Sequence, residues 1–186
     1  WDSHDRAWNR SARYVARHAR ALVVVTEGAK EFYTSNGVPS EKILAVANGV
    51  DIAAFSHPES KEAARTRLGL PQSEKIALYI GRLDGWKGTD TLLAASELLT
   101  SGIIAVIGGE PSQIEKLKQQ YPKVRFLGSR PYREIADNQA AADVLVVPNT
   151  APDSTSVRFT SPLKLLAHLA SGRPIVASDL PALREL

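Results

Sequence analysis

Residues 161–181 read S-P-L-K-L-L-A-H-L-A-S-G-R-P-I-V-A-S-D-L-P and predict a helix, a glycine stop and a buried strand. The helix is expected to begin at Ser161-Pro162, because serine is a good N-cap and proline suits the first helical position. Gly172 is expected to end it. The expected apolar face of this helix consists of Leu163, Leu165, Leu166, Leu169 and Ala170.

The start of this predicted helix is a candidate anion site. A polar loop, residues 155–161, precedes it, and the first N–H groups of a helix have no partners within the helix. These N–H groups and the helix dipole together favour a bound phosphate. The sequence therefore predicts a phosphate-binding helix start near Ser161.

The rest of the chain alternates predicted helices and strands. After residue 74, apolar strands are expected at 75–80, 103–107, 124–127, 143–147 and 175–177, and further helices at 89–100, 111–120 and 132–141. Near-continuous apolar strands separated by helices are typical of a parallel sheet that is covered on both faces. The fold class is therefore expected to be α/β, with a doubly wound, Rossmann-like sheet that binds ligands at the carboxyl ends of its strands.

The first 50 residues are expected to belong to a different sheet. Their predicted strands lie at 21–26 and 43–46, and their predicted helices lie at 3–20 and 27–35. The tight turn N-G-V-D at 48–51 follows, and a polar stretch with a small helix at 60–68 leads into the second sheet.

The composition excludes several classes of protein. Hydrophobic residues make up 44% and charged residues 23% of the chain, as in ordinary globular domains, and the net charge of +3 does not indicate nucleic-acid binding. No cysteine is present, which excludes disulfides and thiolate metal sites. No methionine is present either, and we expect a fragment or a processed chain. No signal peptide is visible, so the expected location is cytoplasmic.

Two segments resemble retaining glycosyltransferases of the GT-B fold, in the large glycogen-synthase-like group called glycosyltransferase family 4. Residues 161–181 are similar to the segment that holds the diphosphate of a nucleotide-sugar there. Residues 79–88, Y-I-G-R-L-D-G-W-K-G, resemble the G-R and K-G pair that follows the first strand of the donor domain. The donor-binding residues that this resemblance implies are Gly81, Arg82, Lys87, Thr160, Ser161, Pro162, Leu163 and Lys164.

The residue types of the second segment fit this role. Gly81 allows the backbone to approach a ligand closely, Arg82 offers a bidentate fork for phosphate oxygens, and Lys87 adds a mobile positive charge. The alternative is a surface loop with two solvated cations. The glycines at 81 and 85 lack the G-x-G-x-x-G spacing of dinucleotide sites, so nicotinamide and flavin are not expected.

The resemblance implies the organisation of the chain. Residues 1–51 would be the end of the N-terminal acceptor domain, residues 52–74 the connection, and residues 75–186 a C-terminally truncated donor domain. The implied function is binding of a nucleotide diphosphate-sugar for retaining transfer, in polysaccharide or glycolipid biosynthesis, without a cofactor or metal. The catalytic groups that act on the acceptor would lie in an N-terminal region outside this chain, so we expect the chain alone to bind a donor and to transfer nothing.

One departure from the family pattern weakens this expectation. The family commonly carries two glutamates eight positions apart, which hold a sugar hydroxyl and the ribose diol, and Phe159 and Ala167 stand in their places. Lys164 or His168 are the candidates to replace the second glutamate. In the alternative, Ala167 belongs to the core and the chain is a catalytically degenerate GT-B-like binding or interaction module. A GT-B epimerase or phosphorylase is a weaker rival; a phosphorylase would carry a distinct lysine motif for pyridoxal phosphate, which is absent.

Other polar residues give weaker signals. Arg130, in the loop 128–131, falls where the family often contacts the base, but it assigns no base. Asp143 is expected to be a turn or cap residue, and Asp179 is a candidate for a place near the ligand. The remaining carboxylates that invite a metal interpretation are Glu110 and Asp153, but the histidines lack ligand spacing: His4, His18, His57 and His168.

The first predicted helix carries a basic stripe, because its arginines recur at spacings of three and four: Arg6, Arg10, Arg13, Arg17 and Arg20. Such a stripe is either a solvated helix face or a contact with an anionic membrane surface, at about 1 kcal/mol per cation. The second alternative would place the protein at the inner membrane face.

Overall fold

The computed structural model describes residues 10–83, 85–150 and 163–186, which divide into two compact units. The smaller unit comprises the described residues of Trp1–Gly49, Thr150–Leu163 and Asp179–Leu186. The larger unit comprises those of Val50–Asn149 and Lys164–Ser178.

The smaller unit contains a two-stranded parallel sheet. Its strands are β1 (Leu22–Val24) and β2 (Ile43–Ala45), with the helices α2 (Arg10–His18), α3 (Glu27–Ser35) and α9 (Pro181–Arg184) and the 3-10 turn η1 (Ser40–Lys42). Thr26 caps α3, since its Oγ1 accepts a hydrogen bond from the N–H of Ala29 at 3.1 Å. The prediction of a separate first sheet is confirmed. The helix predicted for residues 3–20 is described only from Arg10, and it ends at His18.

The larger unit contains a five-stranded, all-parallel sheet in the order β5-β4-β3-β6-β7. The strands are β3 (Ile76–Ile80), β4 (Ile103–Ile107), β5 (Arg125–Phe126), β6 (Val144–Val147) and β7 (Ile175–Ala177). The chain starts at the central strand β3, moves out to β5 on one side and returns to β6 and β7 on the other. This order confirms the predicted α/β, doubly wound sheet.

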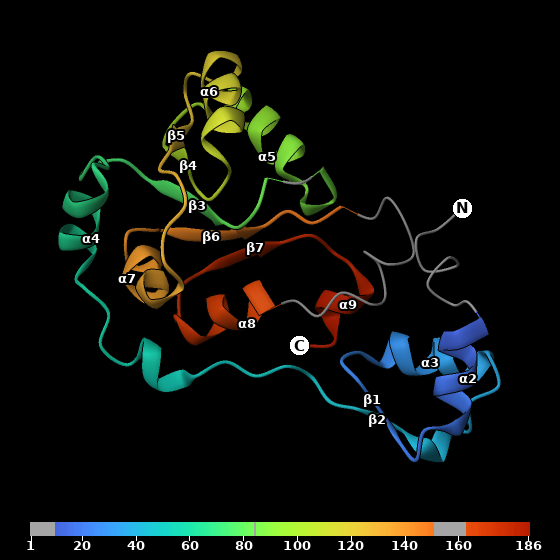
Figure 1. Cartoon of the computed structure of the whole chain (residues 1–186). Helices are drawn as coiled ribbons and strands as arrows, with labels where there is room; N and C mark the ends of the chain where they lie inside the picture. Colours follow the sequence, from blue (N-terminus) through green and yellow to red (C-terminus); the bar gives the residue numbers. More distant parts are fainter. Residues whose placement is uncertain (1–9, 84, 151–162) are drawn as a thin grey trace. The chain divides into compact units, whose positions relative to one another are not determined.

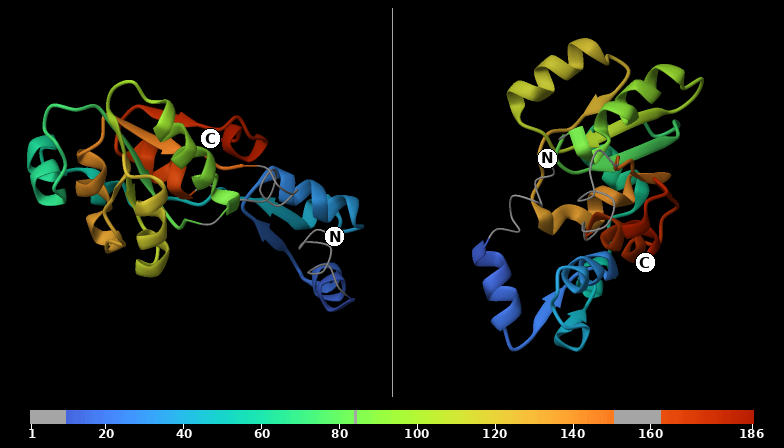
Figure 2. Two further views of the ribbon diagram at one scale, coloured as in Figure 1. Left: turned by 90° about the horizontal axis from the view of Figure 1, so that it is seen from above. Right: turned by 90° about the vertical axis from the view of Figure 1, so that its right-hand side faces the viewer.

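Helices cover both faces of this sheet (Figures 1 and 2). One face carries α4 (Lys61–Leu68), α7 (Ile135–Ala140) and α8 (Leu163–Ala170), and the other carries α5 (Thr89–Ala95) and α6 (Pro111–Gln120). The remaining 3-10 turns are η2 (Ile52–Phe55), η3 (Gly85–Lys87), η4 (Ser96–Leu98) and η5 (Tyr132–Glu134). The helix predicted at 89–100 is therefore shorter and continues as η4, and the one predicted at 132–141 begins with η5.

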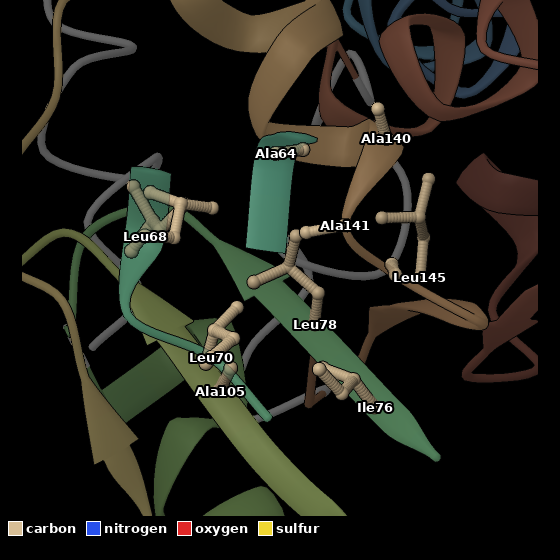
Figure 3. Packing of buried hydrophobic residues seen from close by; sticks show 11 residues of the cluster. Ala64, Leu68, Leu70, Ile76, Leu78, Ala105, Ala140, Ala141 and Leu145 are labelled. Carbon is tan, nitrogen blue, oxygen red and sulfur yellow. The ribbon is translucent and has the colours of Figure 1, made fainter. Parts of the chain in front are cut away.

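Successive side chains of β3 point to opposite faces of the sheet, so the core consists of two layers, one on each face. Ile76 and Leu78 point to the face of α4 and α7, whereas Tyr79 points to the face of α5 and α6. Figure 3 shows the first layer, in which Leu78 lies among small side chains such as Ala64 and Ala141. These alanines let α4 and α7 approach the sheet closely, and Ile76, Leu78 and Tyr79 of the central strand are fully buried.

Asp143 links α4 to the sheet. Its carboxylate accepts hydrogen bonds from Nζ of Lys61 at 2.5 Å, from Nη2 of Arg65 at 2.7 Å and from the N–H of Ile76 at 2.8 Å. Burial raises the pKa of Asp143, but the hydrogen bonds from Lys61 and Ile76 and the charges of Lys61 and Arg65 outweigh it and lower the pKa to about 2. Asp143 is therefore part of a structural ion-pair network and not only a turn or cap residue.

Candidate functional site

Backbone hydrogen bonds join the segments at the carboxyl ends of β3, β4 and β5. The N–H of Gly81 donates to the carbonyl of Ile107 at 2.9 Å, and the N–H of Gly108 donates to the carbonyl of Gly128 at 2.9 Å. Gly108 has a φ of +124°, and a Cβ placed on it would lie 2.0 Å from the carbonyl oxygen of Gly81. Only glycine fits this position, so the two loops can lie in contact directly above the strands.

A cavity of about 520 Å³ opens beside this contact, within the range typical of small-molecule sites. Two hydrogen bonds brace its walls: Nε2 of Gln113 donates to the carbonyl of Leu83 at 2.8 Å, and Oγ of Ser129 donates to the carbonyl of Gly109 at 3.1 Å. The lining residues come from the last positions of β3 and β4, from the loops after β3, β4 and β5, and from the first turn of α6: Ile80, Gly81, Arg82, Leu83, Ile107, Gly108, Gly109, Glu110, Gln113, Ser129 and Arg130.

Three charged side chains line this cavity. Arg82, implied by the sequence, and Arg130, from the loop after β5, are both exposed and bring positive charge to its walls. Glu110, at the start of α6, is also exposed and adds a carboxylate. The cavity thus combines guanidinium groups, which suit phosphate oxygens, with an acceptor that can take hydrogen bonds from hydroxyl or N–H groups.

Lys87 ends η3, which is pressed against the end of β6. The next residue, Gly88, has a φ of +70°, and a Cβ on it would lie 1.6 Å from the carbonyl oxygen of Pro148. This tight contact fixes where α5 begins and therefore where Lys87 lies. Lys87 is close enough to Lys164 of α8 to affect its titration, so the structure brings together two of the cations that the sequence singled out.

Lys164 lies in the first turn of α8 with its amine buried. Its Nζ is 3.8 Å from the centroid of the Tyr79 ring, and a Cβ added to Gly81 would lie 3.0 Å from this nitrogen. Burial, and secondarily the charge of Lys87, lower the pKa of Lys164 to about 7. Gly81, Lys87 and Lys164 therefore form one cluster at the end of β3. The other predicted donor-binding residues before α8 lie outside the described residues: Thr160, Ser161 and Pro162.

The apolar face predicted for α8 is partly wrong. Leu163 and Leu169 are 57% and 50% exposed, so these two leucines do not pack against the core as predicted. Instead the buried face contains Leu165, Ala167 and His168. The error arises because leucines surround much of this helix, and the burial of its faces is set by residues far away in the sequence. Gly172, with a φ of +65°, follows the helix end as predicted.

The buried face of α8 bears on the missing family glutamate. Ala167 is 2% exposed and packs with Phe55 and Ala136. His168 is fully buried, forms a 2.9 Å hydrogen bond between its Nδ1 and Nε2 of Gln139, and has its pKa lowered to about 4, first by burial and then by Lys164. His168 is therefore unavailable as a contact to a ribose, whereas Ala167 belongs to the core, as the alternative interpretation expected. Phe159 lies outside the described residues.

The remaining candidates are not among the residues that line the cavity. Asp179 is exposed and forms an ion pair with Arg184, which lowers the pKa of the Asp179 carboxyl.

The basic stripe is helical and exposed where it is described, at Arg10, Arg13 and Arg17, and the exposed Arg20 follows the end of α2. Arg6 and Asp153 lie outside the described residues. No helix in the described part of the chain has the length and apolar character needed to cross a membrane.

Several residues of the cavity were not predicted. Gly108 and Gly109 were not among the predicted donor-binding residues, and Tyr79, which lies beside Lys164 and does not line the cavity, was interpreted only as part of the strand β3. Gln113 and Ser129 carry no motif at all. The available signal was positional: each of these residues, Tyr79 apart, follows the carboxyl end of a predicted parallel strand, where such sheets bind ligands.

Comparisons with known proteins show relatives of this chain in sequence and in fold. The sequence model of the family described as glycosyl transferases group 1 matches residues 74–186, which is more than half of the chain. A D-inositol 3-phosphate glycosyltransferase of Thermobispora bispora is 33% identical over 178 residues, covering 86% of this chain and 40% of that protein. D-inositol 3-phosphate glycosyltransferase 1 of Catenulispora acidiphila is 30% identical over 188 residues, covering 91% and 43%. The chain thus spans less than half the length of these relatives.

Solved structures share the fold. Sucrose-phosphate synthase of Thermosynechococcus elongatus matches with a TM-score of 0.73 at 26% identity, covering 99% of this chain and 48% of that one. Anabaena HepE, solved in complex with UDP-glucose, matches with a TM-score of 0.75 at 21% identity, covering 95% and 50%. Since the family model covers most of the larger unit and the neighbouring structures share its sheet, the chain belongs to the glycosyl transferases group 1 family and has the α/β architecture of a GT-B C-terminal domain.

Proposed function

We propose that this chain is the donor-binding part of a retaining glycosyltransferase and that it binds a nucleoside diphosphate-sugar at the carboxyl ends of β3 and β4. One observation carries the proposal: the cavity at these strand ends has walls of glycine backbone and is lined by Arg82 and Arg130. In parallel α/β sheets, ligands bind at this edge. Residues 1–51 would be the end of an acceptor domain, joined by residues 52–74.

The chemistry of such a site is the stabilisation of a leaving group. As the bond between the anomeric carbon and the phosphate oxygen breaks, negative charge builds up on the diphosphate. Arg82 and Lys87 are the candidates to neutralise it, together with the N–H groups after Thr160. Fixed cations and N–H dipoles that face developing charge are usually the largest catalytic contribution of a site. The cavity beyond Arg82 has room for the nucleoside.

The relatives support sugar transfer in preference to a binding module. Two of them are named D-inositol 3-phosphate glycosyltransferases, and one structural neighbour was solved with UDP-glucose. Because this chain spans less than half of the named relatives, we place the groups that position an acceptor outside it.

A degenerate binding module is the second candidate function. It is favoured by Ala167, which is part of the core where the family commonly has a ribose-binding glutamate. A module of this kind should bind no nucleoside diphosphate, so a binding experiment distinguishes the two functions.

Calorimetric titration with UDP, GDP and ADP tests the proposed site. We expect one of the three to bind, and we expect Arg82→Ala to weaken that binding about 10- to 100-fold. This is the effect of losing a charged hydrogen bond of roughly 1.5–3 kcal/mol. The size of the loss follows from the pairing of a guanidinium with phosphate oxygens, which alanine cannot replace.

Arg133→Ala is the matched control. Arg133 is exposed and does not line the cavity, so its loss removes the same charge from the chain without touching the proposed site. Equal weakening by both variants would mean that only net charge matters. Binding of none of the three nucleotides would support the degenerate module.

A further inference from the structure

The amine of Lys164 is buried without an ordinary partner. Its Nζ is inaccessible to solvent and has no hydrogen-bond partner among the described residues. Among the described residues, no carboxylate forms an ion pair with it. It lies over the face of the Tyr79 ring, with Nζ 3.8 Å from the ring centroid. A buried ammonium ion in such surroundings is costly, whereas a neutral amine is not.

Among the described residues, the groups that face Lys164 add no negative charge. On β3, Tyr79 donates its hydroxyl hydrogen to the carbonyl of Arg82 at 2.7 Å. On η3, Lys87 is a cation that repels a second positive charge. On α8 itself, His168 lies one turn further along and is neutral near pH 7, because burial and Lys164 lower its pKa to about 4. These surroundings hold the pKa of Lys164 at about 7, first through burial and then through Lys87.

The position of this amine connects it to the proposed donor site. Gly81 lines the cavity, and a Cβ added to it would lie 3.0 Å from Nζ of Lys164. A diphosphate held by Arg82 and Lys87 would therefore bring negative oxygens towards this nitrogen. The attraction of such a dianion, together with new hydrogen bonds, favours the protonated amine.

We propose that Lys164 is a neutral amine in the empty site and takes up one proton from solvent when a diphosphate binds, so that donor binding is coupled to protonation of this side chain. This inference rests on the proposed function. The proton adds to the free electron pair of Nζ, and the resulting ammonium ion donates to phosphate oxygen. Positive charge thus appears at this position only together with its ligand.

Linkage sets the direction of the pH dependence. A group whose pKa rises on binding strengthens binding most below its free pKa and loses that contribution as the pH rises towards the bound pKa. With a free pKa of about 7, affinity is expected to fall with rising pH above neutrality. For one coupled proton the fall reaches at most about tenfold per pH unit.

Calorimetry at pH 8 in Tris and in HEPES measures the coupling, because these buffers have different ionisation enthalpies. UDP, GDP and ADP are titrated in turn. Because pH 8 lies above the second phosphate pKa of about 6, the nucleotide itself takes up few protons. The expected result is uptake of more than half a proton per bound nucleotide. Lys164→Arg should bind without uptake, because its guanidinium is already charged. Lys164→Met should bind more weakly, also without uptake.

Lys118→Met, an exposed position on α6, is the control and should leave the uptake unchanged. Binding without proton uptake by the unaltered chain, or the same uptake in Lys164→Arg and Lys164→Met, would overturn the coupling and leave the donor site standing. If none of the nucleotides binds, the proposed function fails and the coupling fails with it. A nuclear magnetic resonance titration of Lys164 in the ligand-free chain gives an independent answer, since an ordinary pKa above 10 would also overturn the proposal.

Discussion

Exchange of Arg65 for methionine is expected to destabilise the larger unit by about 3–5 kcal/mol, the usual cost of breaking a buried ion pair from one side. Arg65 is 2% exposed. Its Nη2 donates to Asp143 at 2.7 Å and its Nε donates to the carbonyl of Ala141 at 3.0 Å. Methionine fills much of the same volume but leaves the carboxylate and the carbonyl without this donor.

The same guanidinium also closes the loop that leads into β3. Its Nη1 lies within hydrogen-bond distance of the carbonyls of Pro71, Gln72 and Glu74, at 3.2, 2.7 and 3.0 Å. These carbonyls belong to the turn that joins α4 to the central strand. Loss of Arg65 therefore affects the attachment of α4, the turn and the start of β3 and β6 at once, which is why the expected effect is large.

Urea denaturation followed by circular dichroism measures this effect, with Arg67→Met as the matched control. Arg67 lies on the same helix, but its side chain is 30% exposed, pairs with Glu59 and donates to Oδ1 of Asn138 at 3.0 Å. Its loss is expected to cost about 1–2 kcal/mol, less than the loss of Arg65. Equal free energies of unfolding for the two variants would contradict a structural role for the buried pair.

Gly88→Ala is expected to lower the free energy of unfolding by at least about 3 kcal/mol and to abolish nucleotide binding. The new Cβ would lie 1.6 Å from the carbonyl oxygen of Pro148 and 2.5 Å from its carbon. Both atoms are backbone, so the end of β6 and the start of α5 must separate. Since η3 precedes Gly88 directly, Lys87 would be displaced from Lys164 and from the proposed diphosphate.

Gly69→Ala separates this steric effect from simple backbone strain. Gly69 has nearly the same φ, +66° against +70°, but a Cβ on it meets nothing within 4 Å. Its replacement is expected to cost only about 1–2 kcal/mol, the penalty for a side chain in the left-handed region. Thermal unfolding of both variants provides the comparison. Similar losses in the two would show that the contact with Pro148 has little influence on stability.

The sheet was predictable because its strands carry local signals. Each run such as 103–107 is apolar at nearly every position, as required when both faces of a strand are covered. The glycine after α8 was predictable for the same reason, because a left-handed residue at a helix end is a local requirement. The faces of helices were harder to predict: Leu169 is exposed although it was expected in the apolar face, and the buried face of α8 is set by Gln139 and Phe55, which come from distant parts of the chain.

The site was predictable only where it forms a motif. Arg82 and Lys87 stand in a recognisable pattern after β3, whereas Gln113 and Ser129 reach the cavity through the order of the strands. No local pattern reports that β4 and β5 lie beside β3. The burial of Lys164 and its lowered pKa were also unpredictable. The burial depends on packing against Tyr79, and the pKa depends on this burial and on the charge of Lys87.

The most direct test of the donor site is a map of amide chemical shifts in the isotopically labelled chain, titrated in turn with UDP, GDP and ADP. The account predicts that one nucleotide shifts the amide resonances of Gly81, Gly108, Gly109 and Gly128, which lie at the carboxyl ends of β3, β4 and β5. Shifts confined to residues of α2 and α3, or no shifts with any of the three nucleotides, would contradict it.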